Sequence, residues 1–257
     1  MRLHVEASGT GAVPLVCLHG WGLNLRVFDG LREQLPPGQA VIGIDLPGHG
    51  GSGWDAARAS FEAQAEWLLE HLPERCHLLG WSLGGQLALQ LATRAPARVA
   101  TLILIATTPR FAAGADWVPG LAQPVMQRFA EHLARDWQGT VREFLQLQVR
   151  GSRDAQGVLA LLEQALQAQG QARPAALRAG LEILNAVDLR ARLPAVTAPA
   201  LLITGQHDRI TPPAAGVYLA QALRTARLAE LKRAGHAPFL SHPAAVSQLV
   251  RDFLAAA

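Results

Sequence analysis

Cysteine and long apolar stretches are scarce in this sequence, and each scarcity excludes a class of protein. The 257 residues include two cysteines, too few for a disulfide framework. No apolar stretch approaches the roughly 20 residues that a membrane-spanning helix needs. Residues 1–6 also lack the apolar segment of a signal peptide. We therefore expect a soluble, cytoplasmic protein without a membrane partner.

Lysine is nearly absent, although basic residues as a group are not. One of the 23 Lys and Arg residues is a lysine, and the arginines are dispersed among 20 acidic residues. Because the sequence has no basic tail, RNA-binding signature or zinc finger, we expect no nucleic-acid partner. It has no H-E-x-x-H motif or Cys/His ligand spacing, so we also expect no metal and no cofactor.

Half of the residues are apolar, and their pattern predicts the fold class. Short runs that are apolar at nearly every position alternate with longer stretches of helical periodicity, as in strands covered by helices on both faces. This alternation predicts a mostly parallel, doubly wound α/β sheet with right-handed crossovers. Cys17 and Cys76 lie in such runs, so we expect buried, unpaired thiols. The predicted strands are 13–18, 40–46, 76–81, 99–106, 199–205 and 227–233. The predicted helices lie near 25–35, 60–72, 83–94, 214–223 and 244–254.

Residues 111–178 depart from this alternation. They contain no strand-like run, and apolar residues such as Phe129 and Leu133 recur every four residues. We expect an all-helical cap over the C-terminal edge of the sheet, where ligands bind in open α/β folds, with residues 1–110 and 179–257 as the core. Extra helices packed on one face of the sheet are the alternative. The expected breaks between cap helices are Pro119, Pro124, Gly139, Gly151 and Gly170.

The motif Gly80-Trp-Ser-Leu-Gly84 is the strongest chemical signal in the sequence. It follows a predicted strand and precedes a predicted helix, which predicts Ser82 on a sharp turn with its hydroxyl exposed. Side chains at positions 80 and 84 would clash with so tight a turn, which explains the two glycines. We predict that Ser82 is a catalytic nucleophile; a serine that merely caps the helix is the alternative.

A serine nucleophile needs an imidazole to accept its proton and an acid to orient that imidazole. Two late turns supply these groups in the chain order serine, acid, histidine. Asp208 follows the predicted strand 199–205, and His236 follows the strand-like run 227–233. We therefore predict a triad of Ser82, His236 and Asp208. His207 is a rival base, but adjacent side chains leave a turn in different directions.

The segment His19-Gly-Trp-Gly22 supplies the remaining element of a hydrolase site. Main-chain N–H groups can bind a developing oxyanion without reorganising, and the expected pair is that of Trp21 and Leu83. His19 is expected to bond the loop backbone below the site. The glycine-rich turn 45–52 lacks the G-x-x-x-x-G-K-[ST] pattern of a phosphate loop, so we expect it to be structural.

With these residues in position, the chain resembles the α/β-hydrolase superfamily over its whole length. Closer still, it resembles the pimeloyl-[acyl-carrier protein] methyl ester esterases of biotin synthesis. The runs Phe144-Leu-Gln-Leu-Gln148 and Gly180-Leu-Glu-Ile-Leu184 are the most specific to that family. The resemblance implies the α/β-hydrolase fold and a carboxylesterase that cleaves a methyl ester through an acyl-enzyme. The segments that carry it are 19–24, 79–85, 140–148, 180–190 and 234–243.

The resemblance also implies substrate contacts and a partner. In that family, arginines of the cap engage the acidic acyl-carrier protein. Arg142, Arg150 and Arg153 are the candidates here, although Arg142-Glu143 reverses the order of acid and arginine usual in the family. Gln146 replaces a smaller residue of the family. The implied substrate contacts are Trp21, Ser82, Leu83, Phe144, Leu145, Gln146, Leu147, Gln148 and His236.

Two other functions remain open from the sequence. The chain could be another triad enzyme of the same fold, such as a lyase of menaquinone synthesis or a hydrolase of carbon–carbon bonds. It could also be a ligand-binding protein that retains the triad. Release of p-nitrophenol from p-nitrophenyl esters separates a carboxylesterase from a ligand-binding protein. Complementation of a biotin auxotroph separates it from another triad enzyme.

Overall fold

The structure is a computed structural model that describes residues 1–256. Within these residues, seven strands form one sheet in the order β1-β3-β2-β4-β5-β6-β7. Neighbouring strands are parallel except β1, which pairs antiparallel with β3 at the edge. The strands are β1 (Val5–Ser8), β2 (Leu15–Leu18), β3 (Val41–Ile44), β4 (Cys76–Trp81), β5 (Val99–Ile105), β6 (Ala200–Gly205) and β7 (Ala226–Leu231).

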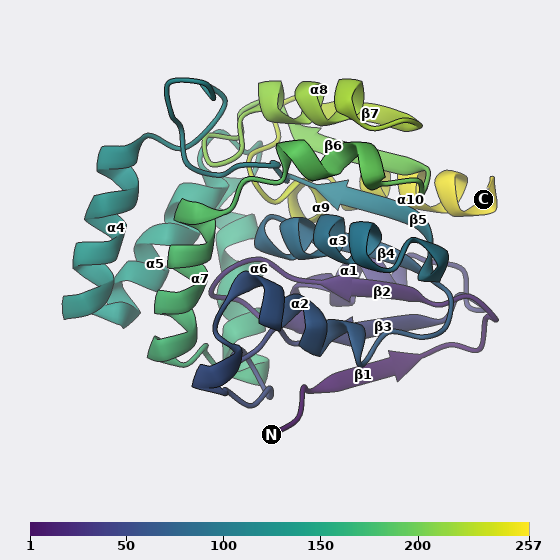
Figure 1. Cartoon of the computed structure of the whole chain (residues 1–257), viewed down its shortest axis with the longest axis horizontal. Helices are drawn as coiled ribbons and strands as arrows, with labels where there is room; N and C mark the ends of the chain where they lie inside the picture. The colour runs from purple at the N-terminus through teal and green to yellow at the C-terminus, as the bar shows by residue number, and fades with distance from the viewer. Residues whose placement is uncertain (257) are drawn as a thin grey trace.

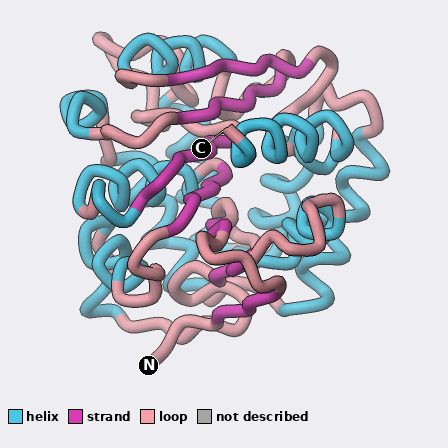
Figure 2. The backbone as a smooth tube through the Cα atoms, turned by 90° about the vertical axis from the view of Figure 1, so that its right-hand side faces the viewer, coloured by secondary structure: helices cyan, strands magenta, loops and turns pink. Residues whose placement is uncertain are grey.

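Helices cover both faces of this sheet, as Figures 1 and 2 show. Helices α2, α3 and α8 lie on the near face in Figure 1, and α1 and α10 lie behind the sheet. Every residue of β2 and β6 is buried, which accounts for their unbroken apolar sequence. The core helices are α1 (Asp29–Glu33), α2 (Phe61–Leu69), α3 (Leu83–Arg94), α8 (Pro213–Ala222), α9 (Pro238–Ser241) and α10 (Pro243–Ala255).

The sequence predicted six of the seven strands of residues 1–256, with bounds that differ by at most two residues at either end. The strand β4 and the helix α3 have the predicted bounds. The edge strand β1 was missed because Val5–Ser8 is a short segment that is mostly exposed, and it does not form an apolar run. Cys17 and Cys76 are buried and unpaired in residues 1–256, as predicted.

A mostly helical insertion separates β5 from β6. Figure 1 shows its helices beyond the end toward which β5 points, so the cap covers the C-terminal edge of the sheet. The all-helical prediction is wrong for residues 111–122, which form no helix and carry two isolated bridges, Ala112 with Leu121 and Gly114 with Trp117. The insertion comprises α4 (Gln123–Arg135), α5 (Trp137–Val149), α6 (Ala155–Gln169) and α7 (Pro174–Ala186).

Three of the expected breaks do not separate two helices. Pro119 precedes α4, and Pro124 lies in the first turn of α4. Gly139 lies in the first turn of α5, where its N–H donates to the side chain of Asp136 at 2.9 Å.

The chain enters and leaves the cap through two segments that are joined to each other. Arg110 and Asp188 form an isolated antiparallel bridge, and the Leu189 N–H donates to the carbonyl of Pro109 at 2.9 Å. The expected cap boundary at residue 178 lies inside α7, which continues to Ala186. The division of the chain into core and cap stays a prediction, and a boundary after α7 suits the helix better.

No helix in residues 1–256 combines the length and the apolar character needed to cross a membrane.

Candidate active site

Ser82 occupies a strained turn between β4 and α3. Its φ of 56° lies in the left-handed region, which few residues other than glycine adopt. A Cβ on Gly80 would lie 2.4 Å from the Gly84 carbonyl oxygen, and one on Gly84 would lie 2.2 Å from that of Leu18. The predicted need for glycine at both positions is therefore confirmed. The turn presents the Ser82 side chain toward the loops that follow the other strands.

The structure brings Ser82, His236 and Asp208 into one hydrogen-bonded chain. The Nε2 atom of His236 lies 2.9 Å from Ser82 Oγ, and its Nδ1 atom lies 2.8 Å from Asp208 Oδ2. All three residues are at least 96% buried, so the prediction of an exposed Ser82 hydroxyl is wrong: the hydroxyl faces His236 in a buried position. An imidazole with Nδ1–H bound to the carboxylate leaves Nε2 free to accept the serine proton. This arrangement can generate a serine nucleophile.

The Asp208 carboxylate is fixed by groups that the sequence did not single out. Its Oδ1 accepts the N–H groups of Ile210 and Thr211 at 2.8 and 2.9 Å, and its Oδ2 accepts the Thr211 hydroxyl at 2.7 Å. These donors hold the carboxylate in one orientation. The pattern Asp-x-x-Thr is common in turns, and it could have identified Thr211.

Trp81 is another residue that sequence reasoning missed. Its indole Nε1–H donates to the carbonyl of His236 at 2.8 Å, and its ring lies 5.7 Å from the imidazole. Because Trp81 directly precedes Ser82, the indole links the serine turn to the loop that carries His236. The residue type at an x position of a G-x-S-x-G motif does not by itself predict a contact with the catalytic histidine.

The N–H groups of Trp21 and Leu83 are available as anion donors. Gly20 lets the loop of Trp21 approach the serine, since a Cβ on this glycine would lie 3.3 Å from the Cβ of Ser82. No hydrogen bond within residues 1–256 uses the main-chain N–H of Trp21 or of Leu83. The Trp21 indole instead donates to the Leu177 carbonyl at 2.9 Å, which fixes the side chain against α7.

Two buried imidazoles hold the loop 19–22 in place through hydrogen bonds to main-chain groups. His19 bonds the Gly20 carbonyl through Nδ1 at 2.8 Å, and its Nε2 accepts the Leu46 N–H at 2.9 Å. His49 bonds the Pro47 carbonyl through Nδ1 at 3.0 Å, and its Nε2 accepts the Gly22 N–H at 3.2 Å. The structural role predicted for His19 is confirmed. Both rings must be neutral with the proton on Nδ1, because each Nε2 accepts a main-chain N–H.

Burial disfavours the charged form of both rings. It lowers the pKa of His19 to about 4, and, together with the nearby His19, it lowers the pKa of His49 to about 3. A folded-state pKa below the ordinary value means that the unfolded chain binds more protons in acid. The two neutral rings contribute their full share of the protein's stability above pH 6.5. This contribution is lost as the pH falls toward the two folded-state pKa values.

The free energy of unfolding is therefore expected to fall between pH 6.5 and 5. Each imidazole contributes up to about 1.4 kcal/mol per pH unit. Urea denaturation across this range measures the slope. His49→Gln keeps an acceptor for the Gly22 N–H but has no titrating ring, so the slope should become shallower. An unchanged slope in this variant would show that protonation of His49 does not control acid stability.

The apolar wall beside the site comes from the cap. Phe144 is buried and packs edge-on against Trp21, with ring centroids 5.0 Å apart, and it meets Phe129 at 5.9 Å. The α5 residues expected to contact substrate differ in exposure: Leu145 and Gln148 are buried, Leu147 is half-buried and Gln146 is exposed. The exposed side chain of Gln146 therefore does not form part of the buried wall.

Both side-chain amide atoms of Gln148 are buried and have no partner within residues 1–256. The main-chain carbonyl oxygen of Gln148 accepts the His236 N–H at 3.0 Å, so this residue lies directly beside the triad. An unpaired amide in a buried position costs free energy, and such groups often bind a polar atom of a ligand.

The predicted docking arginines lie outside this buried region. Arg142, Arg150 and Arg153 are exposed, and none of them forms an ion pair in the described part of the chain. Glu143, which follows Arg142, faces another group: its carboxylate lies 3.6 Å from Arg128 and 3.2 Å from His132.

The rival base His207 points away from Ser82. It is exposed, and its Nδ1 lies 2.9 Å from the Gly151 carbonyl oxygen in the cap. The loop 45–52 is structural as predicted: the Asp45 carboxylate accepts the N–H groups of Leu25 and Gly51, each at 2.8 Å. The first 256 residues contain no cluster of three or more His, Cys, Asp and Glu side chains suited to a metal ion.

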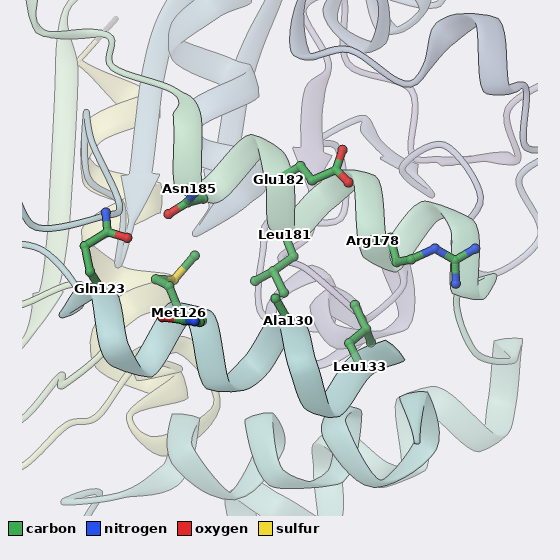
Figure 3. Close-up of a pocket in the computed structure, with 9 residues that line it drawn as sticks. Gln123, Met126, Ala130, Leu133, Arg178, Leu181, Glu182 and Asn185 are labelled. Carbon is green, nitrogen blue, oxygen red and sulfur yellow. The ribbon is translucent and has the colours of Figure 1, made fainter. Parts of the chain in front are cut away.

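A groove of about 450 Å³ lies elsewhere on the cap, between α4 and α7. Figure 3 shows side chains of the two helices facing each other across it, with apolar groups such as Met126 and Leu181 between polar ones. None of the triad residues lines this groove. The residues that line it are Gln123, Met126, Gln127, Ala130, Leu133, Arg178, Leu181, Glu182 and Asn185.

Comparison with known proteins identifies the fold and the family. The α/β-hydrolase fold family matches residues 13–243. The chain is 45% identical over 241 residues to a protein of Nitrosomonas europaea named pimeloyl-[acyl-carrier protein] methyl ester esterase; the match covers 94% of this chain and 95% of the relative. A protein of the same name from Aromatoleum aromaticum is 44% identical over 243 residues, 93% of this chain and 96% of the relative.

A solved structure gives the same fold. An esterase from Exiguobacterium antarcticum superposes with a TM-score of 0.86 at 23% identity, over 98% of this chain and 94% of that one. At this identity the likeness concerns the fold alone. The predicted fold class is confirmed.

Proposed function

This chain belongs to the α/β-hydrolase fold family and, within it, to the pimeloyl-[acyl-carrier protein] methyl ester esterases, and we propose that it hydrolyses the methyl ester of a pimeloyl chain on acyl-carrier protein, a step of biotin synthesis. It is a carboxylic ester hydrolase. The observation that carries the proposed mechanism is the chain of hydrogen bonds from Ser82 through His236 to Asp208.

In this mechanism, Ser82 Oγ attacks the ester carbonyl while His236 Nε2 accepts its proton. Asp208 holds the imidazole in the required tautomer and stabilises the imidazolium. The imidazolium then donates the proton to the leaving methoxide, so methanol departs and an acyl-enzyme remains. A water molecule, deprotonated by the same imidazole, releases the free carboxylate and restores Ser82.

The main-chain N–H groups of Trp21 and Leu83 would bind the oxygen that becomes negative in both steps. Each is free of other partners in residues 1–256, and each belongs to a buried residue beside Ser82. Donors fixed before the reaction stabilise the charge without reorganising, and removing one typically costs about 100- to 1000-fold in rate.

The acyl chain is expected to lie along Phe144 and Leu147 of α5. Each buried methylene contributes roughly 0.8 kcal/mol, so a wall of this kind favours a chain over acetate. Gln148 is proposed to bond a polar atom of the acyl chain, because its amide is buried beside His236 without a partner in the described residues.

Phe144→Ala is expected to raise KM more for a hexanoyl ester than for an acetyl ester. The variant removes the ring that packs on Trp21 and Phe129, and the longer chain loses more apolar contact. Steady-state kinetics with p-nitrophenyl acetate and p-nitrophenyl hexanoate measure the difference. Equal effects on both substrates would remove Phe144 from the acyl pocket.

The carrier protein is proposed to dock on the exposed arginines of the cap. Arg142, Arg150 and Arg153 have no ion-pair partner within residues 1–256, so their guanidinium groups are free for carboxylates and the phosphopantetheine phosphate. Arg150 and Arg153 belong to the turn after α5, close to the loop that carries His236.

Replacing all three arginines by Ala is expected to lower kcat/KM for carrier-bound ester but not for p-nitrophenyl acetate. Rim charges mainly set the rate of encounter, and salt screens them, so the defect should shrink as ionic strength rises. Arg128→Ala is a matched control, since this arginine lies on α4 and pairs with Glu143. A loss shared by both substrates, or one that salt leaves unchanged, would count against docking here.

The direct test of the proposed function is the fate of pimeloyl-[acyl-carrier protein] methyl ester. Mass spectrometry should show loss of the methyl group while the acyl chain stays on the carrier. An intact substrate would favour a lyase, a carbon–carbon bond hydrolase or a ligand-binding protein, and release of the carrier thiol would assign thioester cleavage instead. The cytoplasmic location expected from the sequence stays a prediction.

A further inference from the structure

The turn between α5 and α6 touches both loops that carry the acid and the base of the triad. The last two residues of α5 and the turn that follows, residues 148–153, form the cap turn. The acid loop is residues 205–208, and the histidine loop is residues 233–236. The three segments are far apart in the sequence, and each is held by hydrogen bonds to the other two.

The cap turn binds the histidine loop at three points. The Gly235 N–H donates to Ser152 Oγ at 3.1 Å, and the His236 N–H donates to the Gln148 carbonyl at 3.0 Å. In the opposite direction, the Arg153 N–H donates to the Arg233 carbonyl at 2.9 Å. These bonds span every residue of the histidine loop except Ala234.

The acid loop completes the junction. His207 Nδ1 donates to the Gly151 carbonyl at 2.9 Å, and the His207 N–H donates to the Ala234 carbonyl at 2.8 Å. The contact is close at both glycines of the junction. A Cβ on Gly235 would lie 2.7 Å from Ser152 Oγ, and one on Gly151, whose φ is +79°, would lie 2.6 Å from the Cβ of His207.

The main chain of His236 is therefore clamped between the cap and the sheet. Its N–H is bound to Gln148 of the cap, and its carbonyl is bound to the Trp81 indole of the sheet at 2.8 Å. The position of this main chain decides whether the imidazole reaches Ser82 and Asp208 together. A misplacement of about 1 Å in a catalytic group can cost on the order of 100-fold in rate.

We propose that Ser152 and His207 are positioning residues for this reaction: through Gly235 and Gly151 they fix the cap turn to the histidine loop and so hold His236 between Ser82 and Asp208. The cap is then part of the catalytic apparatus as well as a cover for the acyl chain. This inference rests on the proposed triad mechanism.

Two pairs of variants test the proposal with p-nitrophenyl acetate, a substrate too small to need the arginines or the acyl wall. Ser152→Ala removes the acceptor for the Gly235 N–H, and Ser152→Thr keeps it. His207→Leu removes the donor to Gly151, and His207→Asn keeps an N–H at the same place. We expect kcat to fall about tenfold in Ser152→Ala and in His207→Leu, with KM within twofold of wild type. Ser152→Thr and His207→Asn should recover most of kcat.

Ser60→Ala is the matched control for Ser152→Ala. Ser60 Oγ also accepts one main-chain N–H, that of Ala63 at 3.2 Å, but it caps α2 away from the site. Its replacement should lower the thermal midpoint without changing kcat. His207 is exposed, so His207→Leu should fold even if Ser152→Ala does not.

The proposal is overturned if Ser152→Ala and His207→Leu keep wild-type kcat, or if the conservative variants lose as much activity as the others. Loss of kcat in proportion to the loss of folded protein would also overturn it. Failure of the triad mechanism would be seen separately, as ester turnover that survives in Ser82→Ala.

Discussion

Ser82→Ala is expected to abolish ester hydrolysis, with a fall in kcat on the order of a millionfold. The hydroxyl is the only group of the site that can form the acyl-enzyme, and its removal leaves His236 with no proton to accept. The fold should be retained, because the side chain is small and Ser82 Oγ contributes one hydrogen bond, to the imidazole. Steady-state kinetics with p-nitrophenyl acetate and a thermal midpoint measure both effects.

His236→Ala should cost about as much as Ser82→Ala, and the double variant should cost no more than either. The serine and the imidazole act as a unit, so losing one already removes the function of the other. Two additive losses would mean that the residues act independently. Substantial turnover in Ser82→Ala would mean that the nucleophile is another group.

Asp208→Asn is expected to keep the structure and lower kcat about ten-thousandfold. The Asn carbonyl can still accept the N–H groups of Ile210 and Thr211, because they bind the single oxygen Oδ1. Its amide then presents an N–H where Oδ2 faced His236. The ring must accept that N–H through Nδ1, so its own proton moves to Nε2, which can no longer accept the proton of Ser82.

Asp136→Asn is the matched control for this substitution. Asp136 also accepts a main-chain N–H at the start of a structural element, that of Gly139, but it lies at the end of α4 in the cap. The control should leave kcat unchanged. Wild-type activity in Asp208→Asn would mean that a different acid orients His236.

The sequence predicted the serine turn well because the information there is local. The apolar run of β4, two glycines that no other residue can replace and the periodicity of α3 together define both elements to the residue. The chain order of Ser82, Asp208 and His236 follows from the fold class alone. Gly139 was predicted to end a helix, but it lies inside the first turn of α5, where its N–H donates to the side chain of the capping residue Asp136.

What the sequence could not predict depends on contacts between distant segments. Ser152 stands in an ordinary polar turn, and the sequence presented His207 only as a rival base. Only the folded chain brings the two residues to either side of the histidine loop. Trp81 resembles any apolar residue of a strand until its indole reaches the His236 carbonyl. Periodicity encodes which face of an element is buried, but it does not encode which loop of another element that face will meet.

Trapping the acyl-enzyme identifies the nucleophile. The enzyme is mixed with p-nitrophenyl hexanoate, quenched in acid within the first turnover, digested and analysed by mass spectrometry. We expect one hexanoyl group per chain, attached to Ser82 and formed together with a burst of p-nitrophenol. A hexanoyl group on another residue, or turnover with no covalent adduct and no burst, would contradict the proposed mechanism.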